Sequence, residues 1–201
     1  LVGKIAADHI VEALEMSHYA NVLCESLPKV ATYGKADAAL SPPVRLYAAP
    51  EHDLLVLQSD IPIAPGPAAE FAQCLAGWQR DRNVTPIYLS GLATDKDEAV
   101  PSMYGVAAGD GAALLDDAEI ASPSERGLIS GPTGALLHES IANNLTAVGL
   151  IVESDPQFPD PEAARLLIKS GIEPLTGESI DTQNLVEHTE EIQEAKQQLA
   201  K

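Results

Sequence analysis

The amino-acid sequence predicts a three-layer α/β domain whose mainly parallel sheet is flanked by helices. Short apolar runs typical of strands alternate with segments of helical period along the 201 residues. The run "TAVGLIVE" at 146–153 is apolar almost throughout, which is typical of a strand covered on both faces in a parallel sheet. We find no internal repeat or long linker. We therefore expect one α/β domain over residues 1–178, followed by a helical segment over residues 179–201.

Apolar residues at three- and four-residue spacing predict the helices of this domain. They span residues 1–17, 66–82, 110–118, 132–141 and 160–171. The second is expected to bury a stripe formed by Phe71, Cys74, Leu75 and Trp78. The last is expected to begin at the cap formed by Asp160 and Pro161 and to end at Gly171. Strands are predicted between the helices, at 19–24, 44–48, 53–59, 86–91, 103–109 and 146–153.

Polar residues at the ends of the predicted strands are the candidates for a ligand pocket. In an open parallel sheet, ligands bind beyond the carboxyl ends of the strands. The candidates that would converge there are Gln58, Ser59, Asp60, Ser130, Gly131, Thr133 and Gly134, with Asp60 as the acid. The alternative is that these residues cap helices and close turns, as such residues do routinely.

The stretch "LISGPTGALLHESI" at 128–141 is expected to form the end of a strand, a glycine-proline turn and the start of a helix. A phosphate loop of the Walker type needs a Lys after its last glycine, but Gly134 is followed by Ala135. The dinucleotide fingerprint is absent as well. An anion could still contact the amides of Thr133 and Gly134 at the start of the helix. Since the stretch contains no Lys or Arg, we favour a structural turn.

Other catalytic and metal-binding templates fail. His138-Glu139 begins a metalloprotease motif, but Ala142 stands where the second histidine ligand belongs. No nucleophile elbow of the form Gly-x-Ser-x-Gly is present. The five histidines are dispersed, and the acidic clusters lack calcium-loop spacing. The sequence therefore predicts no catalytic residue, no metal site and no cofactor.

Charge is the dominant feature of the composition. The chain has 30 acidic and 12 basic residues and a formal net charge of −18. Nucleic acid and anionic membranes are poor partners for such a chain because it offers no basic face. The self-repulsion is relieved at about 1 M salt, where the Debye length is about 3 Å. We favour a protein from a salt-loaded cytoplasm; an ordinary acidic domain, or one with a basic partner, is the alternative.

Two further features concern compartment and association. Cys24 and Cys74 are isolated in the sequence and are expected as small buried thiols of a reducing, cytoplasmic compartment, with an extracellular disulfide as the alternative. The longest apolar run is too short to cross a bilayer. In the last segment, Leu185, Ile192 and Leu199 recur one heptad apart on a narrow stripe. This stripe predicts a helix that docks on a neighbour or another subunit, rather than one packed wholly on its own domain.

Six segments taken together resemble archaeal members of the proteasome assembly chaperone 2 family. They are "LVGKIAADHIVEAL", "LLVLQSDIPI", "YLSGLA", "MYGVAAG", "SGPTGALL" and "AVGLIVESDPQFPDPEAARLL", in matching order over nearly the whole chain. The acidic composition points to a haloarchaeal version. The resemblance implies an α/β fold related to the nucleoside phosphorylases, self-association, and an assembly role with proteasome α-subunits as candidate partners, rather than turnover.

The family also supplies an alternative function and two expectations about the chain ends. Family members have been labelled ATP-dependent carboxylate–amine ligases, so a ligase or nucleoside-processing enzyme using the strand-end pocket is the alternative. Relatives carry a strand and a glycine-rich turn before the first helix, so Gly3 would end that turn and the chain would start late. Some relatives bind the α-ring through a C-terminal hydrophobic-Tyr-any tripeptide. This chain ends Leu199-Ala200-Lys201 instead, so either its tail continues or it does not dock in that way.

Overall fold

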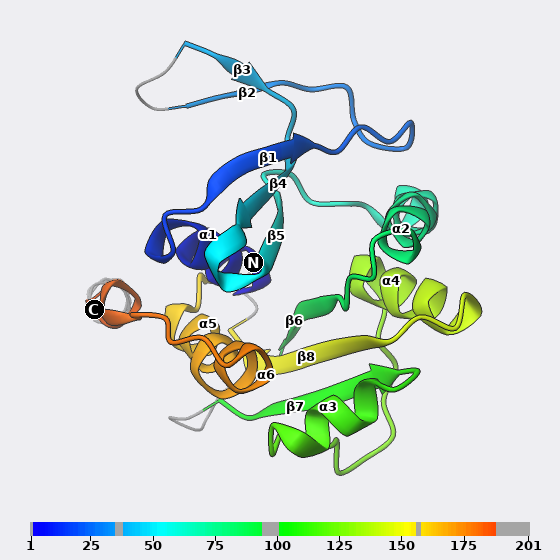
Figure 1. The fold of residues 1–201 in the computed structure, drawn as a ribbon, viewed down its shortest axis with the longest axis vertical. Helices are drawn as coiled ribbons and strands as arrows, with labels where there is room; N and C mark the ends of the chain where they lie inside the picture. Colours follow the sequence, from blue (N-terminus) through cyan, green and yellow to red (C-terminus); the bar gives the residue numbers. More distant parts are fainter. Residues whose placement is uncertain (1, 35–37, 94–100, 156–157, 188–201) are drawn as a thin grey trace, which may run out of the picture.

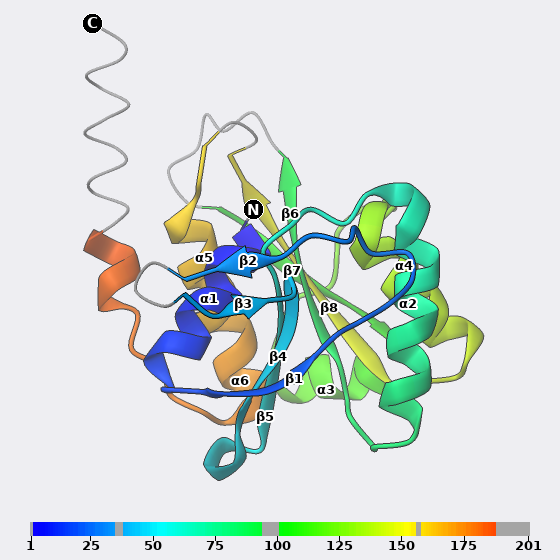
Figure 2. The ribbon, with the colours of Figure 1, turned by 90° about the horizontal axis from the view of Figure 1, so that it is seen from above.

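A computed structural model describes residues 2–34, 38–93, 101–155 and 158–187 (Figures 1 and 2). The helices are α1 (Val2–Ala13), α2 (Pro65–Arg80), α3 (Gly111–Asp117), α4 (Gly131–Ala142), α5 (Pro161–Leu167) and α6 (Glu173–Thr176), with a 3₁₀ turn η1 (Pro50–His52) and a π-helical turn η2 (Ile168–Ile172). The strands are β1 (Ser17–Asn21), β2 (Thr32–Tyr33), β3 (Leu40–Ser41), β4 (Val44–Ala49), β5 (Leu54–Ser59), β6 (Ile87–Ala93), β7 (Met103–Ala108) and β8 (Ala147–Ser154). The alternation of strands and helices expected from the sequence is present.

The first sheet has the strand order β1-β4-β5 and is covered by helices on both faces. Successive side chains of β4 point to opposite faces. Val44 and Leu46 lie in an apolar cluster with Phe71 of α2. Tyr47, on the other face, packs against the cluster that contains Ile10 of α1. Both views accordingly show α1 and α2 on opposite sides of β4 and β5 (Figures 1 and 2).

The second sheet has the order β6-β8-β7, with β8 at its centre. Nearly every residue of β8 is buried, because helices cover both of its faces. On one face Gly149 leaves room for Leu137 of α4. On the other, Leu150 packs with Leu167 of α5 in the largest apolar cluster. The prediction that this run is a fully covered strand is confirmed.

The prediction of a mainly parallel sheet is wrong. Among the described residues, the strands of β1-β4-β5 pair antiparallel, and β7 is antiparallel to β8. Only β6 and β8 form a parallel pair. The short turn η1 joins β4 to β5, with Asp53 in the left-handed conformation (φ 49°). A connection this short cannot make the crossover of a dozen or more residues that parallel strands need.

The helix predicted over 160–171 begins as expected but runs past its predicted end. The Asp160 side chain caps it by accepting a hydrogen bond from the Ala163 N–H (3.0 Å). Gly171 lies inside the π-helical turn, where a Cβ would stand 2.6 Å from Leu150 Cδ1. The helical path continues through α6 to Gly177, whose φ of 75° ends it. Gly171 is therefore a packing residue rather than a helix terminator.

The two cysteines form a disulfide, so the expectation of buried thiols is wrong and the pairing named in the alternative is present. Cys24 is buried in the cluster around Phe71, whereas Cys74 is exposed on α2 instead of belonging to its buried stripe. Their Cα atoms are 6.7 Å apart. The bond ties the loop after β1 to α2. Among the described residues, no helix has both the length and the apolar character needed to cross a membrane.

Candidate functional site

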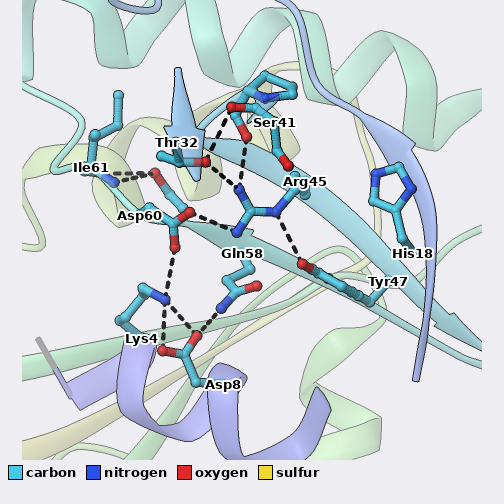
Figure 3. A network of polar contacts seen from close by, with 12 residues as sticks. Lys4, Asp8, His18, Thr32, Ser41, Arg45, Tyr47, Gln58, Asp60 and Ile61 are labelled. Carbon is cyan, nitrogen blue, oxygen red and sulfur yellow. Dashed lines mark hydrogen bonds and ion pairs between the residues drawn. The ribbon is translucent and has the colours of Figure 1, made fainter. Parts of the chain in front are cut away.

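A network of charged side chains lies between α1 and the first sheet (Figure 3). Arg45 and Tyr47 are two residues apart on β4 and therefore share the face that α1 covers. Gln58 of β5 lies opposite Arg45 in the antiparallel register. Asp60 follows directly after β5, and its backbone N–H donates to the Pro43 carbonyl at 2.8 Å. Local strand geometry thus gathers polar groups on one face next to a helix.

Arg45 is the centre of this network. Its guanidinium donates to Asp60 Oδ2 (2.6 Å) and to the Tyr47 hydroxyl (3.0 Å). It also donates to the Thr32 hydroxyl at 3.1 Å and to the Pro42 carbonyl at 2.8 Å. The Thr32 hydroxyl in turn donates to the Ser41 carbonyl, across the β2–β3 hairpin. One side chain therefore joins β4, the end of β5 and the hairpin.

Helix α1 supplies the other half of the network. Lys4 contacts Asp8 one turn along the helix at 2.6 Å and reaches Asp60 Oδ1 at 3.2 Å. The Gln58 amide donates to Asp8 Oδ1. We call Lys4, Asp8, Arg45 and Asp60 the charge network. Its two cations and two carboxylates are matched, so the group as a whole is neutral.

The environment stabilises the charged forms of Arg45 and Asp60. Burial acts to raise the pKa of Asp60, but hydrogen bonds from Arg45 and Lys4 outweigh it, so the pKa lies below its usual value. Burial likewise acts to lower the pKa of Arg45, and its bonds to Tyr47 and Asp60 raise it instead. The Arg45 side chain is only 12% exposed. Asp60 is thus held as a carboxylate and is a poor proton acceptor near neutral pH.

The chemistry open to the charge network is limited by this pairing. Both cations are engaged by carboxylates, which leaves little positive charge for a phosphate. Among the residues that the structure describes, no group of three or more His, Cys, Asp or Glu side chains could hold a metal ion. The network can, however, fix α1 and the hairpin relative to the sheet. Its geometry suits positioning better than catalysis.

The residues expected to form a strand-end pocket fall into two separate groups. Gln58, Ser59 and Asp60 end β5, whereas Ser130, Gly131, Thr133 and Gly134 open α4. No hydrogen bond or ion pair joins the groups within the described ranges. Neither group lines the hollow of about 80 Å³ beside Pro42 or that of about 200 Å³ beside His9. Both hollows are smaller than the about 300–1,000 Å³ of typical small-molecule sites.

The start of α4 has the geometry of a tight turn, as expected, but the prediction that a strand ends just before it is wrong, because residues 128–130 are not in a strand. Gly131 adopts a φ of 67°, a conformation that favours glycine. A Cβ on Gly134 would stand 2.3 Å from the carbonyl oxygen of Ile129. The glycines therefore let the chain reverse and the helix approach the preceding backbone. Ser130, at the N-cap position, makes no capping hydrogen bond through its side chain.

The predicted contact residues of the last segment are only partly described. Residues 183–187 are helical, and Leu185 is 3% exposed in the same apolar cluster as Val2 and Ile180. Its side chain packs in the chain's own core and presents no free surface. Ile192 and Leu199 lie outside the described residues. Any contact with a partner through this stripe would therefore involve its later part.

Sequence reasoning found Gln58 and Asp60 but missed Lys4, Asp8 and Arg45. Two signals were present. Lys4 and Asp8 have the i,i+4 spacing of a helical ion pair. Arg45 is one of only 12 basic residues in the chain and interrupts an otherwise apolar strand. A scarce cation inside a predicted strand indicates an acidic partner close by, which here is the partly exposed Asp60.

The comparisons with known proteins identify the family. The profile of the PAC2 family matches residues 1–200, nearly the whole sequence. The chain belongs to the PAC2 family. No curated protein matches the sequence significantly. The PAC2 match agrees with the resemblance seen in the six sequence segments.

Solved structures share the fold over nearly the whole chain. Pyrococcus furiosus PbaA, described as an archaeal homolog of proteasome-assembly chaperone, superposes with a TM-score of 0.87 at 22% identity, over 99% of this chain and 82% of that one. P. furiosus PbaB, described as an archaeal proteasome activator, gives a TM-score of 0.82 at 18% identity, over 100% and 88%. A Thermoplasma acidophilum protein of unknown function gives 0.80 at 25% identity, over 96% and 78%. At these identities the likeness concerns the fold.

Proposed function

We propose that this chain is a non-enzymatic, self-associating assembly chaperone that acts on the proteasome through its α-subunits. The observation that carries the proposal is the match of residues 1–200 to the PAC2 family. It is supported by similar folds in PbaA and PbaB, one described as a proteasome-assembly chaperone homolog and the other as a proteasome activator. The net charge of −18 supports work in a salt-loaded cytoplasm, as expected for a haloarchaeal protein.

The arrangement of the candidate site favours binding over turnover. An ATP-dependent ligase would place cations and metal-binding carboxylates around a triphosphate. Here the best-placed acid, Asp60, is paired with Arg45 and Lys4, and its pKa is lowered. Within the described residues, no hydrogen bond joins the glycine-rich start of α4 to that acid, and this start carries no cation. No observation in the described residues favours the ligase over the chaperone.

The test is assembly of archaeal proteasomes from purified α- and β-subunits at about 2 M KCl, with and without this chain. We expect the chain to co-elute with α-subunits and to increase the yield of peptidase-active particles without remaining in them. Identical yield and no co-elution would contradict the proposal.

A second measurement addresses the enzyme alternative. Titration calorimetry with MgATP should give no heat of binding. Binding that disappears in Asp60→Ala and persists in the matched acid variant Asp53→Ala, on the turn before β5, would support the enzyme. Asp53 is a useful control because it is an acid outside the charge network, at the opposite end of β5 from Asp60.

A further inference from the structure

One end of the molecule exposes an unusual number of large apolar side chains. The strand β1 and the β2–β3 hairpin lie at the same end in Figure 1, and both lie in front in Figure 2, which looks onto that end. The exposed residues are Tyr19 (57%), Leu23 (79%), Val30 (49%), Tyr33 (81%) and Leu40 (72%), which we call the apolar end. They all fall within 22 consecutive positions of the sequence, 19–40. Leu23 and Val30 line the same hollow. Tyr33 lies opposite Leu40 in the hairpin. Adjoining exposed apolar side chains mark an interaction site, whereas single exposed apolar residues are normal.

The same part of the chain is almost free of the negative charge found elsewhere. Residues 16–50 contain two acidic residues, Glu25 and Asp37, and three basic ones, Lys29, Lys35 and Arg45. This segment carries a net charge of +1. The rest of the chain carries −19, which gives the overall −18. An interface through an acidic face would bury carboxylates of the two copies against one another, which costs free energy even where salt screens longer-range repulsion, whereas an interface at this end would bury few of them.

The backbone at this end also has unused hydrogen-bonding capacity. Among the described strands, β1 pairs with β4 alone, so its outer edge has no neighbour. The register shifts between His18 and Ala20, which leaves Tyr19 as a bulged residue without a cross-strand partner. Bulges and short length are ways in which exposed edges avoid uncontrolled pairing. An edge of this kind can accept an extended segment from a defined partner.

Two covalent or charged contacts hold the apolar end in place. The disulfide to Cys74 fixes Cys24, the neighbour of Leu23, against α2. Arg45 holds Thr32, the neighbour of Tyr33, at 3.1 Å. A surface that is already ordered before binding loses less conformational entropy when it is covered. The exposed side chains are therefore presented on a fixed support.

We propose that the apolar end is the surface by which this chain binds a second copy of itself. This inference rests on the self-association in the proposed function and assigns it to named residues. The distribution of charge over the chain indicates which partner covers this surface. A basic partner would be drawn to the acidic remainder of the molecule, whereas an uncharged apolar end suits a partner as acidic as the chain itself. A second copy is such a partner.

The test compares two sets of variants by light scattering coupled to size exclusion, at about 100 µM and about 2 M KCl. The first set replaces Leu23, Tyr33 and Leu40 with Ser. The matched control replaces Leu128 and Ile141 with Ser, which are 93% and 65% exposed but lie outside the apolar end. We expect oligomers from the wild-type and control proteins. We expect monomers from the triple variant, since losing each buried anchor should weaken association by about tenfold or more.

The outcomes separate this inference from the proposed function. A monomeric wild-type chain, or a triple variant that keeps the oligomer mass, would overturn the inference. Circular dichroism should show that the triple variant is folded, because the replaced side chains are exposed. Capture of proteasome α-subunits is measured on the same samples and judges the proposed function independently. A wild-type monomer whose α-subunit capture is lost in the triple variant would show that another protein covers this end, which also overturns the inference.

Discussion

Reducing the disulfide between Cys24 and Cys74 should lower the free energy of unfolding substantially. The bond spans 50 residues of sequence. In the chain-entropy model, closing a loop of that length removes about 14 cal/mol/K from the unfolded state, or about 4 kcal/mol at 25 °C. Domains of ordinary stability unfold at about 5–15 kcal/mol, so the loss is a large fraction of the total. After reduction the two sulfur atoms must move apart to van der Waals contact, and the exposed Cys74 can do so by rotating its side chain, so the native packing around Phe71 should change little.

The assay is urea denaturation at about 2 M KCl, with and without reductant. Trp78, the single tryptophan, packs against the cluster that contains Cys24 and reports unfolding by its fluorescence. We expect a lower midpoint and a larger m-value after reduction, because the unfolded chain becomes less restricted. A Cys24→Ala/Cys74→Ala variant should not respond to reductant.

Two results would refute this reasoning. Thiol titration that finds both cysteines free in protein purified without reductant would show that the bond does not form. Equal unfolding free energies for the oxidised and reduced proteins, within about 0.5 kcal/mol, would show that the loop closure contributes nothing.

Three further substitutions test the charge network and two local features. Asp60→Asn should lower the unfolding free energy by about 2 kcal/mol at pH 7. Because the pKa of Asp60 is lowered in the folded state, its contribution is present above the usual carboxyl pKa and is lost as pH falls through the folded value. The difference from wild type in urea melts should therefore shrink towards pH 3; a constant difference would contradict this. Gly134→Ala should destabilise by about 1–3 kcal/mol, since its Cβ would meet a backbone oxygen, whereas Gly77→Ala, with open space around it, should be neutral or stabilising in thermal melts. Asp160→Ala should cost about 1 kcal/mol through the lost helix cap, and an unchanged melting temperature would argue against that cap.

The sequence predicted most elements because local patterns encode them. The buried strand at 147–154, the cap at Asp160 and the turn at Gly131 all follow from residues within a few positions of one another. The prediction of a parallel sheet was wrong because it gave more weight to the alternation of strands and helices than to the short connection between two neighbouring strands. Only a few residues separate β4 from β5, and a connection of that length demands a hairpin.

Contacts between distant segments were the least predictable. The disulfide joins residues 50 positions apart, and Asp60 meets a lysine near the start of α1. Neither pairing leaves a periodic signal, because each depends on how helices and sheet pack in three dimensions. The candidate pocket failed for the same reason. Its two groups were expected to meet only because all strands were taken to end at one edge of a parallel sheet.

The charge network and the apolar end are connected through Arg45. A catalytic carboxylate is usually kept short of partners so that it can exchange protons near neutral pH. Asp60 has the opposite environment, since two cations hold it in its charged form. The same guanidinium that neutralises Asp60 binds Thr32 at the base of the hairpin, next to exposed Tyr33. The charge network therefore fixes the position of an exposed surface, which is what a binding protein requires and a catalyst of proton transfer does not.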